Sequence, residues 1–302
     1  MIYSWLIVII LAYLFFAFSS LGDKLVLASR PKPKSYIFYV GAFGASVVVL
    51  IPFINFGFPS TAGLTWIILD SIVRIAGLYS MYVALEKFDV SKVMTTIGAT
   101  QPIFIFVLTW IFWGTVIMSP IYILAFIILF LACIIVSVEK TQKVTQSYLK
   151  LTIFSSVMFS LDYIFVKMVF LSTGFLQGVV WLGIFVFLFV SVLLLSKRYR
   201  KEIFAKRMVL NKGTQAKFVL AQASGGVANF LQSFAIFLAP IAFLPMVNAL
   251  RGIQYAFLFV ITLFISIFFP KILKEGLSKR IIFQKAISIV LIVIGLAILV
   301  IY

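Results

Sequence analysis

The chain carries few charges, no histidine and a single cysteine. Of its 302 residues, 25 are basic and only eight are acidic. Without histidine there is no Cys/His zinc site and no histidine-dependent catalytic set, and Cys133 alone cannot form a disulfide within the chain. Phosphate-binding loops and paired catalytic carboxylates are also missing from the sequence. We therefore expect no metal, no cofactor and no enzyme activity.

Long apolar runs are what the sequence has instead. Hydrophobic residues make up 64% of the chain, and runs of about 20 residues, the length that crosses a bilayer, recur from end to end. This pattern predicts an all-α membrane protein, because a helix satisfies its backbone hydrogen bonds within its own segment. The first run, 2–21, has no basic region before it and no small-residue cleavage site after it. We therefore predict a retained helix rather than a signal peptide.

Ten apolar segments are predicted to be transmembrane helices. Their connections are short, apart from the basic loop 197–215. In order they cover 3–21, 36–54, 64–85, 92–112, 119–137, 148–170, 174–196, 216–238, 245–268 and 282–301.

The basic residues lie on one side of this layout. All except Arg74, Lys167 and Arg251 fall in or beside the odd-numbered loops. By the positive-inside rule these loops are cytoplasmic, which puts both termini outside the cytoplasmic (plasma) membrane. The net charge of +17 is then a signal of topology and an attraction to anionic lipid headgroups, and not a sign of nucleic-acid binding.

The two halves of the sequence resemble each other weakly. Gln101–Thr109 and Gln254–Thr262 share Gln, two Phe, Val and Thr, which pairs the fourth segment with the ninth. Lys24 and Lys167 likewise pair the first segment with the sixth. We therefore predict two repeats, 1–140 and 147–302. Because each repeat has five helices, an odd number, the second enters the membrane from the opposite side, as in many secondary transporters with inverted repeats.

Two stretches carry a likeness to a known family. Residues 268–300 read as a short basic loop before a helix rich in Gly, Leu and Ile, and 84–102 read as a turn followed by a mid-helix proline, Pro102. With the five-plus-five layout, these stretches resemble the drug/metabolite transporter superfamily and its EamA-like ten-helix branch. The resemblance implies a transporter fold with cytoplasmic termini. The sequence departs from it where Tyr255 pairs with Pro102, and where the basic loops place the termini outside.

Five ionisable side chains fall inside the predicted spans: Asp70, Arg74, Asp162, Lys167 and Arg251. Such charges mark functional sites, since a lipid-facing charge costs about 3 kcal/mol or more. Asp70 and Arg74 share a helix face and can pair, either as a structural lock or to hold Arg74 as a substrate anchor. For Asp162, pairing with Arg251 and binding of a coupling proton both stay open. Lys167 lies close enough to a helix end to extend toward the interface.

Arg251 is the strongest candidate because amide side chains flank it within 244–257. Asn248 and Gln254 lie three residues to either side, on the same helical face. An arginine in that setting is suited to a carboxylate or phosphate, and the alternative is a structural pair. Three more polar residues complete the predicted translocation pathway: Gln101, Asn229 and Gln232.

The sequence favours a secondary transporter that moves a small polar or amphipathic metabolite by alternating access. The pathway charges sum to slightly positive, so we expect a substrate with an anionic group. One alternative is a proton-coupled exporter of cationic drugs that uses Asp162. Another is a flippase for a polyprenyl-phosphate-type lipid carrier. The expected partners are the substrate, the lipid bilayer and a coupling proton, and we expect a monomer or a homodimer.

Overall fold

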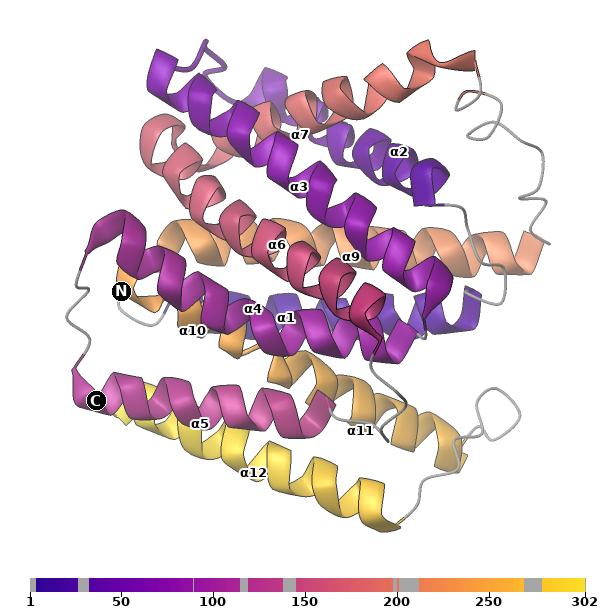
Figure 1. Cartoon of the computed structure of the whole chain (residues 1–302), viewed down its shortest axis with the longest axis vertical. Helices are drawn as coiled ribbons and strands as arrows, with labels where there is room; N and C mark the ends of the chain where they lie inside the picture. The colour runs from indigo at the N-terminus through magenta and orange to yellow at the C-terminus, as the bar shows by residue number, and fades with distance from the viewer. Residues whose placement is uncertain are drawn as a thin grey trace. The chain divides into compact units, whose positions relative to one another are not determined.

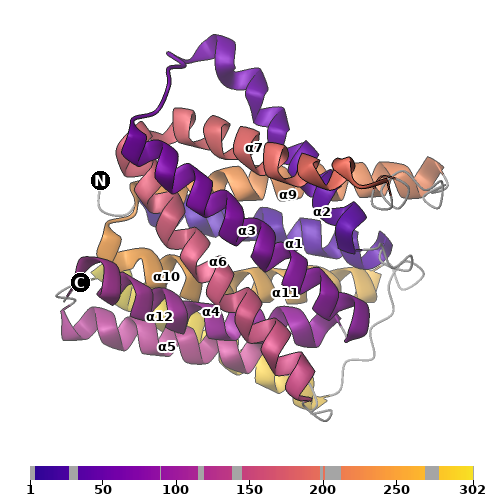
Figure 2. The same ribbon diagram turned by 45° about the horizontal axis from the view of Figure 1, so that its top comes forward.

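The computed structural model describes residues 4–26, 33–88, 90–114, 119–137, 145–197, 200, 212–268 and 279–301. Within these ranges the regular structure is helical and no strand occurs (Figures 1 and 2). The predicted all-α class is therefore confirmed. Most of the basic loop 197–215 lies outside the described residues.

The chain divides into two compact units that draw on both halves of the sequence. Unit 1 consists of Met1–Ala28, Thr109–Lys140 and Lys212–Tyr302, and unit 2 consists of Ser29–Leu108 and Thr141–Asn211. Each unit has its own set of packed helices.

Unit 1 is built on two long helix pairs. Helix α1 packs along α9, α5 packs along α12, and α11 contacts α1, α5 and α12. In Figure 1, α5 and α12 lie side by side. The elements of this unit are α1 (Ser4–Val26), α5 (Pro120–Ser137), α9 (Lys212–Leu238), the 3₁₀ turn η3 (Ile241–Phe243), α10 (Leu244–Ala249), α11 (Gly252–Phe268) and α12 (Lys279–Ile301).

Unit 2 is organised around the packing of α3 against α6. Helix α7 contacts α2, α3 and α6 and the 3₁₀ segment η1. Helix α4 (Val90–Trp113) has its first part, up to Leu108, in this unit. The other elements are α2 (Pro33–Gly44), η1 (Ala45–Phe53), α3 (Thr61–Lys87), α6 (Gln146–Thr173), α7 (Phe175–Ser191) and η2 (Val192–Leu195).

The ends of α3 and α6 are set by local signals. The Ser60 hydroxyl accepts a hydrogen bond from the Gly63 amide, and Thr145 accepts one from the Tyr148 amide in the same way. Gly174 ends α6 with φ of 76°, a left-handed conformation that glycine adopts without strain. These caps set where α3 and α6 begin and where α6 ends.

Small residues let α3 and α6 approach closely. A Cβ atom built on Gly77 would lie 3.1 Å from the Phe159 ring, so only glycine fits there without movement. The Ser155 hydroxyl donates to the Gly77 carbonyl at 3.0 Å, and Ser80 donates to the Leu151 carbonyl at 2.8 Å. Small residues and hydroxyl groups are the usual means of joining helices in lipid, where hydrophobic burial supplies no driving force.

Among the described residues, six helical segments are long and apolar enough to cross a membrane, so the chain is consistent with an integral membrane protein. Three shorter apolar helical stretches, within 37–53, 120–135 and 175–191, accompany them. Helix α9 is long enough at 27 residues, but its amide and serine side chains lower its hydropathy, and it is not among these six segments. The ten-span layout and the inversion of the repeats stay predictions.

Three of the predicted segments are not continuous α-helices. In segment 174–196, α7 changes to the 3₁₀ segment η2 at Val192. Segment 36–54 changes from α2 to the tighter η1 at Ala45, and η1 contains Pro52, which has no N–H to donate. Segment 245–268 was expected to be one helix, but α10 ends at Ala249 and α11 begins at Gly252. The interruption falls in the stretch around Arg251 that the sequence singled out.

Candidate functional site

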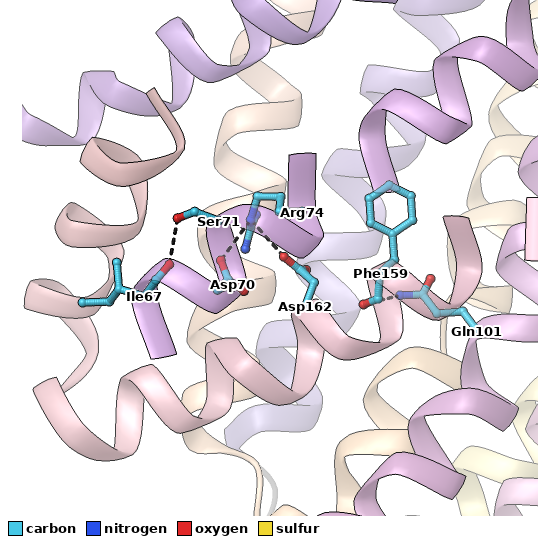
Figure 3. Close-up of polar contacts among 7 residues, drawn as sticks. All are labelled: Ile67, Asp70, Ser71, Arg74, Gln101, Phe159 and Asp162. Atoms are coloured by element: carbon cyan, nitrogen blue, oxygen red, sulfur yellow. Dashed lines mark hydrogen bonds and ion pairs between the residues drawn. The ribbon is translucent and has the colours of Figure 1, made fainter. Parts of the chain in front are cut away.

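Helices α3 and α6 bring three of the predicted charges together in unit 2 (Figure 3). The Nε atom of Arg74 lies 3.3 Å from Oδ2 of Asp70, one helical turn away. The same Nε lies 2.9 Å from Oδ1 of Asp162 on α6. The expected Asp70–Arg74 pair is confirmed. For Asp162 the sequence leaves two interpretations open, an ion pair with Arg251 and the binding of a proton. In the structure, the ion-pair partner of Asp162 is Arg74. We call these three residues the charge cluster.

The charge cluster is largely buried and has more negative than positive charge. Asp70 is fully buried, while 14% of the Asp162 side chain and 31% of the Arg74 side chain are exposed. With every group ionised, two carboxylates share one guanidinium, which leaves a local charge of −1. An uncompensated charge in so apolar a setting is costly, so the cluster favours the uptake of one positive charge.

Some bonding capacity in the cluster is unused. Oδ1 of Asp70 is buried without a hydrogen-bond partner among the described residues. Both contacts of Arg74 use Nε, and no hydrogen bond from Nη1 or Nη2 reaches the part of the chain that is described. Arginine presents five N–H donors in a planar fork. Arg74 can therefore hold the two acids and still donate to a ligand.

A seam of hydroxyl groups runs along α6 beside the cluster. Tyr148, Thr152, Ser156 and Ser160 recur every four residues, the spacing that places side chains on one helical face. All four are buried. This seam is not among the features predicted from the sequence, although its four-residue period is visible in residues 148–160.

The hydroxyl seam joins α6 to α4. Thr96 and Tyr148 share a hydrogen bond of 2.5 Å between their hydroxyls, and Thr100 donates to Ser156 at 2.8 Å. At the cluster end, Ser160 donates to the backbone carbonyl of Gln101 at 3.2 Å.

The side chain of Gln101 also links α4 to α6. Its amide nitrogen donates to the Phe159 carbonyl at 3.3 Å (Figure 3). The predicted pathway residue Gln101 is thus 1% exposed and linked to the helix that carries Asp162.

Unit 1 contains the interrupted helix. At the interruption the Arg251 amide donates to the Asn248 carbonyl, three residues back, instead of to Val247, four residues back. The Tyr13 hydroxyl of α1 donates to the Val247 carbonyl at 2.6 Å. A side chain from another helix therefore replaces the missing backbone bond, as discontinuous membrane helices require.

The polar side chains at this interruption differ in their surroundings. Asn248 is fully buried, and neither of its amide atoms has a hydrogen-bond partner among the described residues. Arg251 is half-buried. Gln254 donates to the Ser20 hydroxyl at 3.0 Å. Asn248 thus lies on α10, Arg251 in the break and Gln254 on α11.

The remaining predicted residues are spread over α9 and α6. Asn229 is exposed and donates to the Gly225 carbonyl of its own helix at 2.8 Å. Gln232 is buried, with 8% of its surface exposed. Lys167 was expected to extend toward the interface, but only 4% of its surface is exposed. In the described ranges no three His, Cys, Asp or Glu residues group together as a metal site would require.

Comparison with known proteins supports the fold and leaves the family open. No protein-family model matches the chain, and no curated protein matches it. A solved structure described as "Crystal structure of protein" is similar over 99% of this chain and 96% of its own, with a TM-score of 0.69 and 12% sequence identity. At that identity the likeness concerns the fold alone.

Removing Arg74 should destabilise the protein more than removing Asp162. Arg74→Gln leaves two buried carboxylates unpaired, and we expect a loss of about 3–5 kcal/mol in the free energy of unfolding at neutral pH. Asp162→Asn should cost less, because Arg74 keeps Asp70. The Arg74→Gln defect should shrink in acid, where protonation neutralises the stranded acids. Chemical unfolding in detergent micelles measures both. Equal losses, or a defect that acid leaves unchanged, would contradict the charge cluster.

The Tyr13 hydroxyl should stabilise the interrupted helix. Tyr13→Phe leaves the buried Val247 carbonyl without its donor and should cost about 1–3 kcal/mol. Tyr79→Phe is the matched control, because Tyr79 is 46% exposed and its hydroxyl makes no hydrogen bond to the described residues. It should change stability by less than about 0.5 kcal/mol. Equal effects of the two substitutions on thermal unfolding would show that the hydroxyl does not support the break.

Proposed function

We propose that the chain is a secondary transporter that moves a small polar or amphipathic metabolite with an anionic group across the cytoplasmic membrane by alternating access. The observation that carries this proposal is the charge cluster of Asp70, Arg74 and Asp162, well inside two helices of membrane-spanning length and composition. Charges in such positions are costly, and they mark ion or substrate pathways in membrane proteins.

Helix packing supports two inverted repeats. If each segment corresponds to the one five places later, α1 corresponds to α6, and α3 corresponds to α9. The packing of α1 with α9 in unit 1 is then equivalent to that of α6 with α3 in unit 2. The α5–α12 and α2–α7 contacts each join a segment to its own counterpart. Such a pattern is typical of transporters that place their substrate site between repeats.

Hydrogen bonds follow the same correspondence. In unit 1 Ser224 of α9 donates to the Phe15 carbonyl of α1, and in unit 2 Ser80 of α3 donates to the Leu151 carbonyl of α6. Both pairs of helices thus meet through a serine and a backbone carbonyl. We retain the EamA-like resemblance, the cytoplasmic odd-numbered loops and the outward termini as parts of the proposal.

The anionic group of the substrate is proposed from the arginines. Arg251 lies at the helix interruption in unit 1, near Asn248, whose buried amide has no hydrogen-bond partner among the described residues. Arg74 has terminal nitrogens that no described residue uses. A guanidinium binds carboxylate and phosphate through two parallel hydrogen bonds. Each unit therefore offers a donor group for such a substrate.

One observation favours a second candidate, the proton-coupled export of cations. The slightly positive charge predicted for the pathway is the sum over all five ionisable residues inside the predicted spans. In unit 2 the charge cluster alone has two acids and one arginine. A cationic substrate could neutralise that cluster directly at Asp162.

Ligand-dependent stability separates the two candidates. Purified protein in detergent is heated with short carboxylates, sugar phosphates or cationic dyes. A ligand at a hundredfold excess over its dissociation constant adds about 2.7 kcal/mol to the stability of the folded state. We expect an anionic compound to raise the melting temperature of the wild type and not of Arg251→Ala.

The control for the ligand experiment is Lys150→Ala. Lys150 is an exposed basic residue on the same chain, and its removal should leave the response to the anion intact. Stabilisation by cations alone, equal in wild type and Arg251→Ala and lost in Asp162→Asn, would favour cation export and overturn the anionic assignment.

A further inference from the structure

We propose that Asp162 and the anionic group of the substrate compete for Arg74, so that the site binds the anion together with one proton. This inference rests on the proposed function and gives it a coupling ion. The observations behind it are the two ion pairs made by one guanidinium, the difference in burial between the two acids, and the unused donors of Arg74.

The two carboxylates hold Arg74 in different ways. Asp70 is on the same helix as Arg74, one turn away, and is fully buried, so its position is set by α3 itself. Asp162 comes from α6, is partly exposed, and reaches Arg74 across the helix contact at 2.9 Å. Asp70 is therefore the permanent partner of Arg74. Asp162 is the more exposed of the two partners.

The proposed step is a proton transfer from a hydronium ion of the solvent to one carboxylate oxygen of Asp162, which leaves a water molecule. An O–H bond forms, the carboxyl becomes neutral, and its ion pair with Arg74 is lost. Asp70 and Arg74 then balance each other, and the cluster changes from a charge of −1 to 0. An incoming carboxylate, sulfonate or phosphate can then replace Asp162 as the ionic partner of Arg74 and accept hydrogen bonds from its terminal nitrogens. Loss of the proton reverses the step, because the Asp162 carboxylate pairs with Arg74 again and displaces the anion.

Few other charges act on this exchange. The ionised groups that act electrostatically on Asp162 and Asp70 are Arg74 and each other. Of the neighbouring helices, α7 has no acidic or basic residue, and α2 and α4 have one lysine each, Lys34 and Lys92. The other charged residues of the two helices themselves are Glu86 and Lys87 on α3 and Lys150 and Lys167 on α6.

A first experiment detects the proton without any substrate. Infrared difference spectra of the protein in lipid nanodiscs are recorded between mildly alkaline and mildly acidic buffer. We expect a band from a protonated buried carboxyl in wild type, its loss in Asp162→Asn, and its retention in the control Glu86→Gln, whose acid is exposed. A band that survives in Asp162→Asn would overturn the assignment of the proton to Asp162.

A second experiment tests the coupling with methanesulfonate, an anion whose charge does not change over this pH range. Its apparent dissociation constant is taken from melting temperatures, with uncharged methanesulfonamide as the comparison compound. For one linked proton, the constant should fall by up to about tenfold for each unit of decreasing pH. Asp162→Asn should bind the anion at every pH as the wild type does in acid.

The outcomes separate this inference from the proposed function. If methanesulfonate binds with no pH dependence, or with the same dependence in wild type and Asp162→Asn, the competition is wrong while anion binding stands. If neither methanesulfonate nor any anion of the metabolite panel stabilises the protein, both proposals are wrong. If sodium ions replace the effect of acid, so that binding depends on sodium and not on pH, the coupling ion is sodium and the proton assignment is overturned.

Discussion

The structure depends on one constraint: a polar group at membrane depth has to find its partner within the protein. Arg74 meets this constraint by holding acids from two helices, Asp70 on its own helix and Asp162 on α6. The contact between α3 and α6 follows from it, together with Gly77 and the serine hydroxyls that let the two backbones approach. The hydroxyl seam then joins α4 to the same helix. In unit 2, the helix contacts and the candidate site are thus built from the same polar groups.

Unit 1 meets the constraint differently. Its polar groups are backbone carbonyls freed where α10 ends and α11 begins, and the Tyr13 hydroxyl from α1 satisfies one of them. Asn248 stays buried beside this break with both amide atoms unpartnered among the described residues. One unit therefore carries a charged cluster on continuous helices, and the other carries an interrupted helix next to an arginine. Both arrangements occur where membrane proteins bind ions or polar solutes.

The sequence predicted the features that depend on local spacing. Apolar runs identified the helical class, and the four-residue spacing of Asp70 and Arg74 predicted their pairing. The ion-pair partner of Asp162 could not be predicted from the sequence, because this contact depends on the register of α3 against α6, and no local sequence pattern encodes that register. The break before Gly252 was missed for a related reason: it is stabilised by Tyr13, more than 200 residues away in the chain. The polarity of 244–257 marked the right stretch, but its periodicity suggested a single helix.

The most direct test of this account is a double-mutant cycle between Arg74 and Asp162. The free energy of unfolding is measured in detergent micelles for wild type, Arg74→Gln, Asp162→Asn and the double variant. We expect the two substitutions not to be additive, with a coupling of about 1–3 kcal/mol, because each removes the same buried ion pair. Additive losses within about 0.5 kcal/mol would mean that the two helices do not meet through this pair, and would contradict the charge cluster on which the account is built.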